Sequence, residues 1–506
     1  MTYNPWYQQW LQYQEWLKNQ HYLNLQNTNA QMYYPQPMIP NQHLAIPQTN
    51  YGTNIKNIPE PVGRIPINPQ DMYLDPDYIL EPVVVGLNFP TCITFDDEGR
   101  LYVGEAGFSY GLADTPEGGR ILEVGRNGAV KEIASGFRGP MTSITWHRGY
   151  FYVAEGQYPG RILRVGKDGS RDVLVDGLRS GADHYTSDVI FGPDGKMYFC
   201  VGSATTSAVV GIDAYYYFNW LQLMPDFHDV PARDLVLNGK NYKSINPFEI
   251  NPQEANVVTG PYMPFGTPAK DGQIVEGQLK ANSVMYQANP DGSDLRVYLD
   301  GIRNVLGLGF APNGKLYFTE FGYDDQHNSR PIKGLETMWE AVKGGWYGFP
   351  DYSAGLPVTD PMFKPKGEPQ PEFVLKKHPP LATKPTVVWE VGSSPSKFDF
   401  SKSQRFGYKN WAFVTLFGSW AYKTQPFGYK VVRVNVETGE TVDFLANLRP
   451  GPKTTGVIRP VDCRFSPDGS SLYVLDFGRI FAVPNSPDLK TEASGGILWR
   501  VRRKQH

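Results

Sequence analysis

The chain has 506 residues, in which 48 Lys and Arg stand against 51 Asp and Glu, for a net charge of −3 at pH 7. This balance excludes a general nucleic-acid binder, which would carry a basic excess. Hydrophobic residues make up 41% of the chain, so it can bury a sizeable core, while 52 Gly, 43 Pro and 14% aromatic residues favour short strands joined by tight turns.

The first 60 residues form a low-complexity extension rich in Gln, Asn and Tyr. Trp6, Trp10 and Tyr13 recur at helical spacing and predict a short amphipathic helix, whereas the prolines between residues 33 and 47 interrupt regular structure. We therefore expect a partly helical or disordered tail, either passive or binding other proteins, followed by a linker at 61–82.

Membrane spans and export signals are not evident in the chain. No apolar run approaches the ~18 residues that cross a bilayer, and the N-terminus lacks a secretory signal pattern. Three cysteines, Cys92, Cys200 and Cys463, are too few for a disulfide scaffold. We expect a soluble protein that does not span a membrane, and its compartment stays open between the cytoplasm and a spore-associated location.

From about residue 83 onward one pattern returns. It is a strand of alternating apolar residues, a turn of Asp-Gly or Asn-Gly type, in several copies Pro-Asp-Gly or Pro-Asn-Gly, and a second strand that begins with a large apolar residue and Tyr. Such turns predict hairpins, with Gly taking the positive φ that the turn requires. The copies span residues 93–107, 189–203, 308–322 and 463–478, and two degenerate copies span 144–156 and 398–418.

The spacing of the copies predicts the architecture. The intervals from Tyr102 to Tyr152 and from Tyr152 to Tyr198 are 50 and 46 residues, and further strand pairs lie between the copies. Four strands in each such interval are typical of a β-propeller blade, so six copies predict an all-β, six-bladed propeller over residues 83–506. Longer intervals predict insertions near 205–280 and 323–385, and residues 495–503 are expected to close the ring.

A propeller brings equivalent positions of its blades together around a central channel. His184, Arg303 with Asn304, and Arg459 stand just before the first strand of three copies. One titratable base beside two fixed cations suits an anionic cofactor or substrate. The alternative is a hydrogen-bonded channel histidine, with a structural arginine at Arg303 that pairs with Glu320 or Asp476.

At these residues the chain resembles a known family. The phrases DHYTSDVIFGPDGKMYFCVGS, IRNVLGLGFAPNGKLYFTEFG, FGSW and RPVDCRFSPDG occur in the order found in the soluble quinoprotein glucose/sorbosone dehydrogenases, with the sorbosone-dehydrogenase-like branch more similar. The resemblance runs from about residue 83 to 503. The chain departs from the branch at Ser187, where an arginine is usual, and at Gly392, where a histidine is usual.

The resemblance implies a six-bladed propeller that binds pyrroloquinoline quinone (PQQ) and calcium and oxidises a sugar or aldehyde by hydride transfer. His184 matches the general base, and Arg303 with Asn304 matches the pair that contacts the quinone. It further implies that the cofactor is contacted by Arg459, Asp476 and Lys423, and that calcium is held by the backbone carbonyls of Gly322 and Tyr323. The electron acceptor is not evident from the sequence.

Two alternatives come from other classes of protein. In the first, the propeller is non-catalytic and serves as a binding or structural component of a larger assembly, such as a spore surface, joined through its N-terminal tail. In the second, it is a calcium-dependent lactonase-type hydrolase, which needs several carboxylates around one axial metal. The carboxylates available for that role follow the second strand of four copies: Glu105, Glu155, Glu320 and Asp476.

Overall fold

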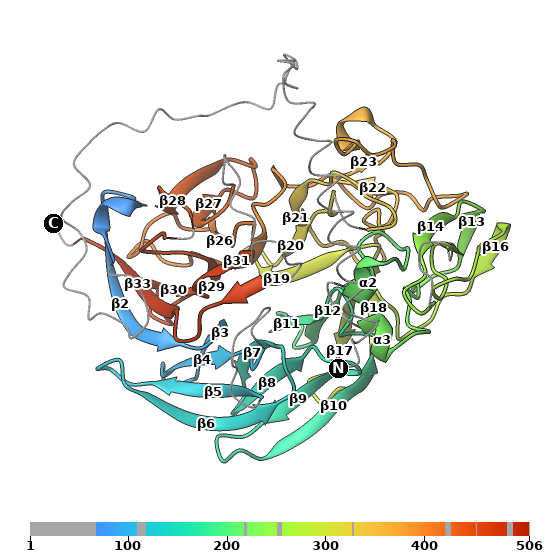
Figure 1. Cartoon of the computed structure of the whole chain (residues 1–506). Helices are drawn as coiled ribbons and strands as arrows, with labels where there is room; N and C mark the ends of the chain where they lie inside the picture. The colour runs from blue at the N-terminus through green and yellow to red at the C-terminus, as the bar shows by residue number, and fades with distance from the viewer. Residues whose placement is uncertain are drawn as a thin grey trace, which may run out of the picture.

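The computed structural model describes residues 67–108, 118–216, 220–249, 256–325, 328–419, 427–451, 453–482 and 489–504. Six antiparallel sheets surround a common centre, so the predicted six-bladed β-propeller is confirmed (Figure 1). The tail at 1–60 and the candidate residue Lys423 lie outside the described residues.

In the first four blades, strands follow one another from the centre outward in chain order. Blades 1 and 2 contain β3 (Pro90–Phe95), β4 (Leu101–Glu105), β5 (Gly119–Val124) and β6 (Val130–Phe137), then β7 (Met141–His147), β8 (Tyr150–Glu155), β9 (Gly160–Val165) and β10 (Arg171–Leu178). Blades 3 and 4 contain β11 (Thr186–Phe191), β12 (Met197–Val201), β17 (Val284–Ala288) and β18 (Arg296–Asp300), then β19 (Asn304–Phe310), β20 (Leu316–Phe321), β21 (Glu336–Glu340) and β24 (Val387–Trp389).

The two ends of the chain close the ring together. Blade 5 contains β25 (Pro395–Phe400), β26 (Ala412–Leu416), β27 (Lys430–Val434), β28 (Thr441–Asn447) and β1 (Met72–Leu74). Blade 6 contains β29 (Pro460–Phe465), β30 (Ser471–Asp476), β33 (Gly496–Arg503) and β2 (Tyr78–Leu87). The C-terminal strand β33 thus lies in the closing blade, as expected. Since β1 and β2 begin before residue 83, the propeller starts within the segment predicted to be a linker.

The hairpin turns have the predicted geometry. Gly195, Gly314 and Gly469 have φ of 72°, 84° and 65°, in the left-handed region that glycine tolerates. In each turn the glycine N–H donates to the carbonyl three residues earlier, at 2.8–2.9 Å. The Pro-Asp-Gly and Pro-Asn-Gly sequences therefore set the register of the two inner strands in blades 3, 4 and 6.

Two excursions leave the ring on the side of blades 3 and 4. The first, between β12 and β17, contains two short helices and two small sheets, formed by α2 (Asp213–Tyr216), α3 (Trp220–Leu223), β13 (Leu235–Asn238), β14 (Tyr242–Ile245), β15 (Asn256–Thr259) and β16 (Asp271–Val275). The second contains η2 (Pro361–Phe363), β22 (Tyr352–Ser353) and β23 (Leu356–Pro357). The excursions share one apolar cluster, and Leu237 bridges Leu375. The predicted insertion at 323–385 includes β21, which belongs to blade 4.

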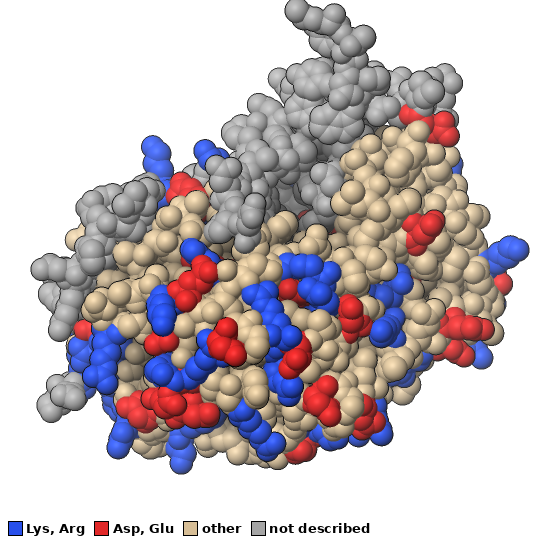
Figure 2. Space-filling view, turned by 90° about the horizontal axis from the view of Figure 1, so that it is seen from below, with Lys and Arg blue, Asp and Glu red and all other residues tan. Residues whose placement is uncertain are grey.

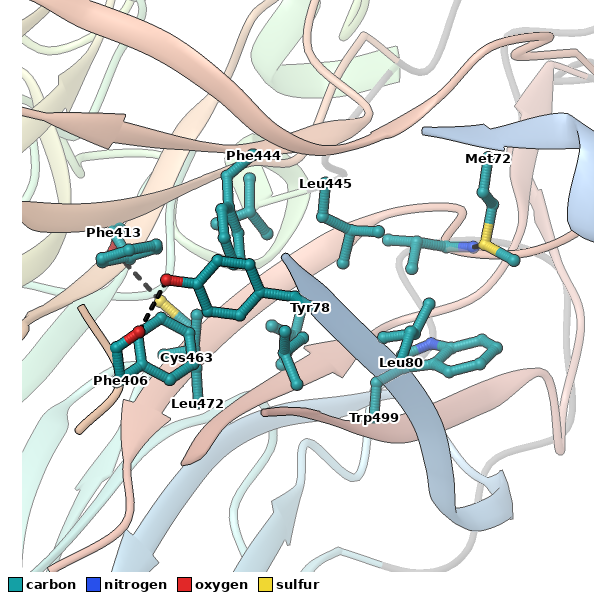
Figure 3. Packing of buried hydrophobic residues seen from close by; sticks show 14 of the residues in the cluster. Met72, Tyr78, Leu80, Phe406, Phe413, Phe444, Leu445, Cys463, Leu472 and Trp499 are labelled. Atoms are coloured by element: carbon teal, nitrogen blue, oxygen red, sulfur yellow. Dashed lines mark hydrogen bonds between the residues drawn. The ribbon is translucent and has the colours of Figure 1, made fainter. Parts of the chain in front are cut away.

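Apolar clusters fill the space between the blades. Figure 3 shows the one between blades 5 and 6, where Tyr78 of β2 reaches the aromatic rings of blade 5. The Phe413 and Phe444 rings meet edge to face at 4.8 Å, and the Tyr78 hydroxyl donates to the carbonyl of Phe406 at 2.6 Å. The buried phenol is thereby paired, and the N-terminal strand is held within the C-terminal blades.

The surface carries both signs of charge. Figure 2 shows basic and acidic residues interspersed on one face, in agreement with the small net charge. Some of these residues pair directly, for example Arg164 and Asp172 at 2.8 Å. No helix in the described ranges is both long and apolar enough to cross a membrane.

Candidate functional site

A carboxylate clasp recurs in four blades at the edge of the ring where the inner strands begin. The carboxylate that follows or ends the second strand accepts the backbone N–H of the residue 17 positions earlier, just before the inner strand. The pairs and their distances are Glu105 with Asn88 at 2.7 Å, Glu155 with Arg138 at 2.8 Å, Glu320 with Arg303 at 2.6 Å, and Asp476 with Arg459 at 2.8 Å. These carboxylates therefore have a local structural role in their own blades.

Blade 3 replaces the clasp with a histidine. Val201 stands where those blades have a carboxylate, and His184 stands 17 residues before it. The Nδ1 atom of His184 lies 2.9 Å from both the carbonyl oxygen and the Oγ of Ser203. The serine Oγ donates its own proton to the carbonyl of Thr205 at 2.6 Å. Both partners of Nδ1 are thus acceptors, so Nδ1 carries the proton and Nε2 keeps its lone pair.

The fold holds this imidazole tightly. A Cβ added at Gly202 would lie 2.5 Å from the Cβ of His184, so only glycine allows the approach. Burial and then the nearby Arg303 guanidinium lower the pKa of His184 well below 6.5. The side chain is therefore a neutral base at physiological pH.

Arg303 lies beside His184, and its hydrogen bonds link its own loop to residues 203–206 and to residues 322–324. Its carbonyl accepts the N–H of Ser203 at 2.8 Å. Its Nε donates to the carbonyl of Thr206 at 2.9 Å, its Nη1 donates to the carbonyl of Gly322, and its Nη2 pairs with Asp324 at 2.8 Å. The guanidinium thus pairs with Asp324, neither with Glu320 nor with Asp476, and two of its five N–H groups are not used in these bonds.

Asn304 and Tyr323 also lie next to Arg303. Asn304 begins β19 and pairs with Phe321 across the hairpin. Tyr323 is buried, its hydroxyl donates to the carbonyl of Tyr352 at 3.0 Å, and the Arg303 guanidinium lies 5.7 Å from its ring centroid. The structure therefore brings His184, Arg303, Asn304, Gly322 and Tyr323 together at the junction of blades 3 and 4.

Arg459 and Asp476 form a separate cluster between blades 5 and 6. The fully buried Arg459 donates to the carbonyls of Gly418 at 2.9 Å, Ser419 at 3.1 Å and Ile480 at 2.9 Å. Asp476 accepts backbone N–H groups of its own blade. Neither residue contacts His184 or Arg303 within the described ranges, so the two predicted cations are not placed side by side.

A second polar group beside His184 was not expected from the sequence. The buried Asp183 accepts the indole N–H of Trp220 at 2.8 Å and the hydroxyl of Thr206 at 3.2 Å. The Thr206 hydroxyl also lies 3.3 Å from the carboxylate of Asp324. Burial raises the pKa of Asp183 to about 7. Because Trp220 comes from the first excursion, no repeat pattern could have identified this contact.

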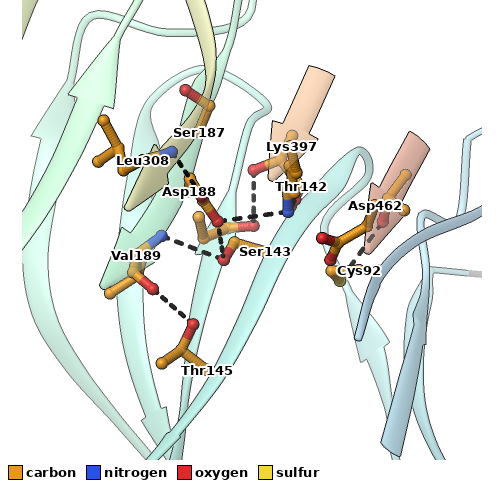
Figure 4. A network of polar contacts seen from close by, with 12 residues as sticks. Cys92, Thr142, Ser143, Thr145, Ser187, Asp188, Val189, Leu308, Lys397 and Asp462 are labelled. Carbon is orange, nitrogen blue, oxygen red and sulfur yellow. Dashed lines mark hydrogen bonds and ion pairs between the residues drawn. The ribbon is translucent and has the colours of Figure 1, made fainter. Parts of the chain in front are cut away.

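Deeper along the inner strands, an ionic network crosses the centre of the ring (Figure 4). The buried Lys397 of blade 5 donates to the carbonyl of Thr142 in blade 2 at 2.7 Å and lies 3.4 Å from Asp188 of blade 3. Arg464 lies 3.7 Å from Asp188 and 3.5 Å from Asp462. Since blades 2 and 5 are not neighbours, the Lys397 side chain spans the channel between the inner strands.

One of the two predicted metal ligands has another partner. The carbonyl of Gly322 accepts a hydrogen bond from Arg303, which uses one of its two lone pairs and places a positive guanidinium beside any cation bound there. The described residues contain no group of three or more His, Cys, Asp or Glu placed to hold a metal ion. The four clasp carboxylates therefore do not form the axial metal site that a lactonase would need.

Comparisons with known proteins agree with the fold. The model of the family described as Glucose / Sorbosone dehydrogenase matches residues 269–480. Quinoprotein glucose dehydrogenase B of Acinetobacter calcoaceticus is 27% identical over 187 residues, which are 36% of this chain and 32% of that protein, so the match spans about a third of the relative's length. The predicted resemblance to this family is thereby confirmed.

Solved structures of low sequence identity share the fold. The holo form of the PQQ domain of a pyranose dehydrogenase from Coprinopsis cinerea has a TM-score of 0.53 at 17% identity, covering 87% of this chain and 98% of that one. A structure of a family AA12 carbohydrate-active enzyme from Trichoderma reesei has a TM-score of 0.52 at 16% identity, covering 86% and 98%.

Proposed function

Because the chain resembles the soluble quinoprotein glucose/sorbosone dehydrogenases, we propose that it is a PQQ-dependent dehydrogenase that oxidises a hydroxyl group of a sugar or aldehyde substrate, with His184 as the general base. The observation that carries the proposal is the hydrogen bonding of His184. A buried imidazole with its proton held on Nδ1 presents a basic Nε2 to a ligand at the mouth of the channel.

The chemistry divides between the cofactor and the chain. When bound, PQQ supplies the acceptor for the hydride that leaves the substrate carbon. His184 Nε2 accepts the hydroxyl proton, so the CH–OH group loses one hydride from carbon and one proton from oxygen, two electrons in all, and becomes a carbonyl. The ring does not rotate away from the substrate because Ser203 holds Nδ1 and the backbone of Gly202 lies directly against it.

Arg303 and Asn304 fit the role of holding the quinone. The guanidinium is held in place by three bonds, and its remaining N–H groups and the half-buried carboxamide of Asn304 offer hydrogen-bond donors beside His184. A fixed cation stabilises negative charge that develops on a nearby oxygen during the reaction. Ser203 is a positioning residue, and Arg459 and Asp476 hold the loops of blades 5 and 6.

The proposal is tested by cofactor binding and turnover. Purified protein would be titrated with PQQ by calorimetry and then assayed with an artificial electron acceptor against a panel of aldoses and aldehydes. His184→Ala should reduce turnover by about 10²–10⁴-fold, the usual contribution of a general base, while PQQ still binds. His228→Ala is the matched control, because the His228 ring forms a hydrogen bond with the carbonyl of Asp226, outside the group of residues around His184.

Each outcome separates the candidate functions. Turnover that needs PQQ and disappears in His184→Ala supports the dehydrogenase. Wild-type protein that takes up no PQQ would overturn it and favour the non-catalytic binding component. Turnover that is unchanged in His184→Ala would show that another group accepts the proton.

A further inference from the structure

Thr206 lies between two carboxyl groups next to the candidate site. Its hydroxyl oxygen is 3.2 Å from Oδ2 of Asp183 and 3.3 Å from Oδ2 of Asp324. A hydroxyl group has one proton, so it donates a full hydrogen bond to only one carboxylate at a time. The direction of the Thr206 hydroxyl therefore depends on which of the two carboxyl groups carries a proton of its own.

Asp324 is the ionised member of the pair. Its Oδ2 accepts Nη2 of Arg303 at 2.8 Å, and its side chain is 55% exposed, so water and a guanidinium both stabilise the charge. The Nε of the same guanidinium donates to the carbonyl of Thr206 at 2.9 Å. Arg303, Thr206 and Asp324 thus form a ring of hydrogen bonds, which is closed only when the Thr206 hydroxyl donates to Asp324.

Asp183 is the member that can carry the proton. It is 7% exposed, and its two side-chain partners, Trp220 and Thr206, are uncharged. The ionisable groups that lie near it are one guanidinium, one phenol and three carboxyl groups: Arg303, Tyr185, Asp213, Asp229 and Asp324. Burial among several carboxyl groups favours the neutral form of Asp183, in agreement with its pKa of about 7.

We propose that Asp183 is a positioning residue that acts as a proton switch for Arg303. With Asp183 protonated, its carboxyl group donates to Thr206 and Thr206 donates to Asp324, which closes the ring. With Asp183 ionised, the Thr206 hydroxyl turns to it and the ring opens. The ionised form also adds a negative charge beside the site, so an anionic ligand binds it more weakly and takes up a proton on binding. The inference rests on the proposed function for the identity of that ligand, PQQ.

The test measures proton uptake and not turnover. PQQ would be titrated calorimetrically between about pH 6 and pH 9 in buffers of different ionisation enthalpy, which gives the affinity and the number of protons taken up. In the unaltered protein we expect the affinity to fall about tenfold over this range, equivalent to a shift of about one pKa unit, with proton uptake between the two limits. Asp183→Asn should show neither effect, because the carboxamide accepts from Trp220, donates to Thr206 and does not titrate. Asp172→Asn, at an exposed ion pair of blade 2, is the control and should behave as the unaltered protein.

A second measurement needs no cofactor. The infrared difference spectrum of the cofactor-free protein over the same pH range should contain the carbonyl band of a protonated carboxyl group, and Asp183→Asn should remove it. Thr206→Val removes the acceptor of that proton and should shift the band, whereas Thr206→Ser keeps the hydroxyl and should leave it in place. A band that does not move in Thr206→Val would overturn the role of Thr206.

The outcomes separate the switch from the proposed function. Proton uptake that persists in Asp183→Asn, or an infrared spectrum that this variant does not change, would assign the titration to another group such as Glu320, whose pKa burial raises to about 7, and would overturn the inference. A band that Asp183→Asn removes, in a protein that binds no PQQ, would overturn the proposed function and leave the switch standing.

Discussion

Buried ionisable groups have different kinds of partner deep in the channel and at the end where the inner strands begin. In the channel, Lys397 and Asp188 contact one another across the ring, and their hydrogen-bonding atoms are directed at protein partners. Where the inner strand β11 begins, His184 has Nδ1 held by Ser203, while Nε2 has no hydrogen bond within the described residues. The comparison shows that one set of inner strands can serve two purposes. Charged groups that pair with one another stabilise the closed channel, whereas a group with an atom that makes no hydrogen bond to the protein is suited to bind or react.

Removing the cation of the channel network should have the largest effect on stability. Lys397→Met leaves the buried carboxylate of Asp188 without its nearest cation and should lower the free energy of unfolding by about 3–5 kcal/mol. Urea denaturation measures this. Lys315→Met is the control, because Lys315 pairs with Glu340 in an exposed position and should change stability by less than about 1 kcal/mol. Equal effects in the two variants would show that the channel network is not a special structural element.

A negative charge introduced at Ser203 should change how kcat/KM depends on pH. Because the folded-state pKa of His184 lies well below 6.5, the base stays neutral and protonation of His184 should not lower kcat/KM between pH 8 and pH 6.5. The same depressed pKa means that this group's contribution to stability falls as the pH drops below 6.5. Ser203→Asp would place a carboxylate beside Nδ1, raise the pKa by about 1 unit or more, and move the acid limb of the profile to higher pH.

An NMR titration of the His184 ring, recorded without cofactor, measures the same shift independently of turnover. Ser203→Ala is the matched control, because it keeps the carbonyl partner of Nδ1 and adds no charge. Protonation of the His184 ring near pH 6.5 in the unaltered protein would contradict the buried, neutral imidazole.

Calcium should have the smallest effect. The carbonyl of Gly322 is bonded to Arg303, so the cofactor-free protein should melt at the same temperature in EGTA and in millimolar CaCl₂. A ligand that binds only the folded state raises the melting temperature by mass action, so even moderate affinity would be detected by calorimetry. A clear upward shift in calcium would contradict this expectation and show that the folded protein binds the ion.

The repeat pattern was a strong guide to the fold and a partial guide to the site. The Pro-Asp-Gly and Pro-Asn-Gly turns predicted the inner hairpins, and the 46- to 50-residue spacing predicted six blades, because both depend on local geometry that recurs in each copy. The boundary at residue 83 was too late, since β1 and β2 carry no repeat phrase and are recognisable only by the strands with which they pair.

Aligning the copies placed His184 and Arg303 in equivalent positions, and the structure puts them side by side. It could not show that Arg459 is directed at carbonyls of blade 5, or that Trp220 reaches Asp183, because those contacts join segments unrelated by the repeat. One signal was present and was missed: Val201 is the residue of blade 3 that stands where four other blades have a carboxylate, and His184 lies 17 residues before it.

By itself, the sequence determined the number of blades, the turns between their inner strands and the residue types available at the mouth of the channel. Those properties follow from short-range backbone preferences and from a period that repeats along the chain. Only the tertiary structure decided which charged groups neutralise one another and which nitrogen of His184 carries the proton. Hydrogen bonding and burial depend on atoms that come from distant parts of the chain, and a local sequence pattern does not predict such tertiary contacts.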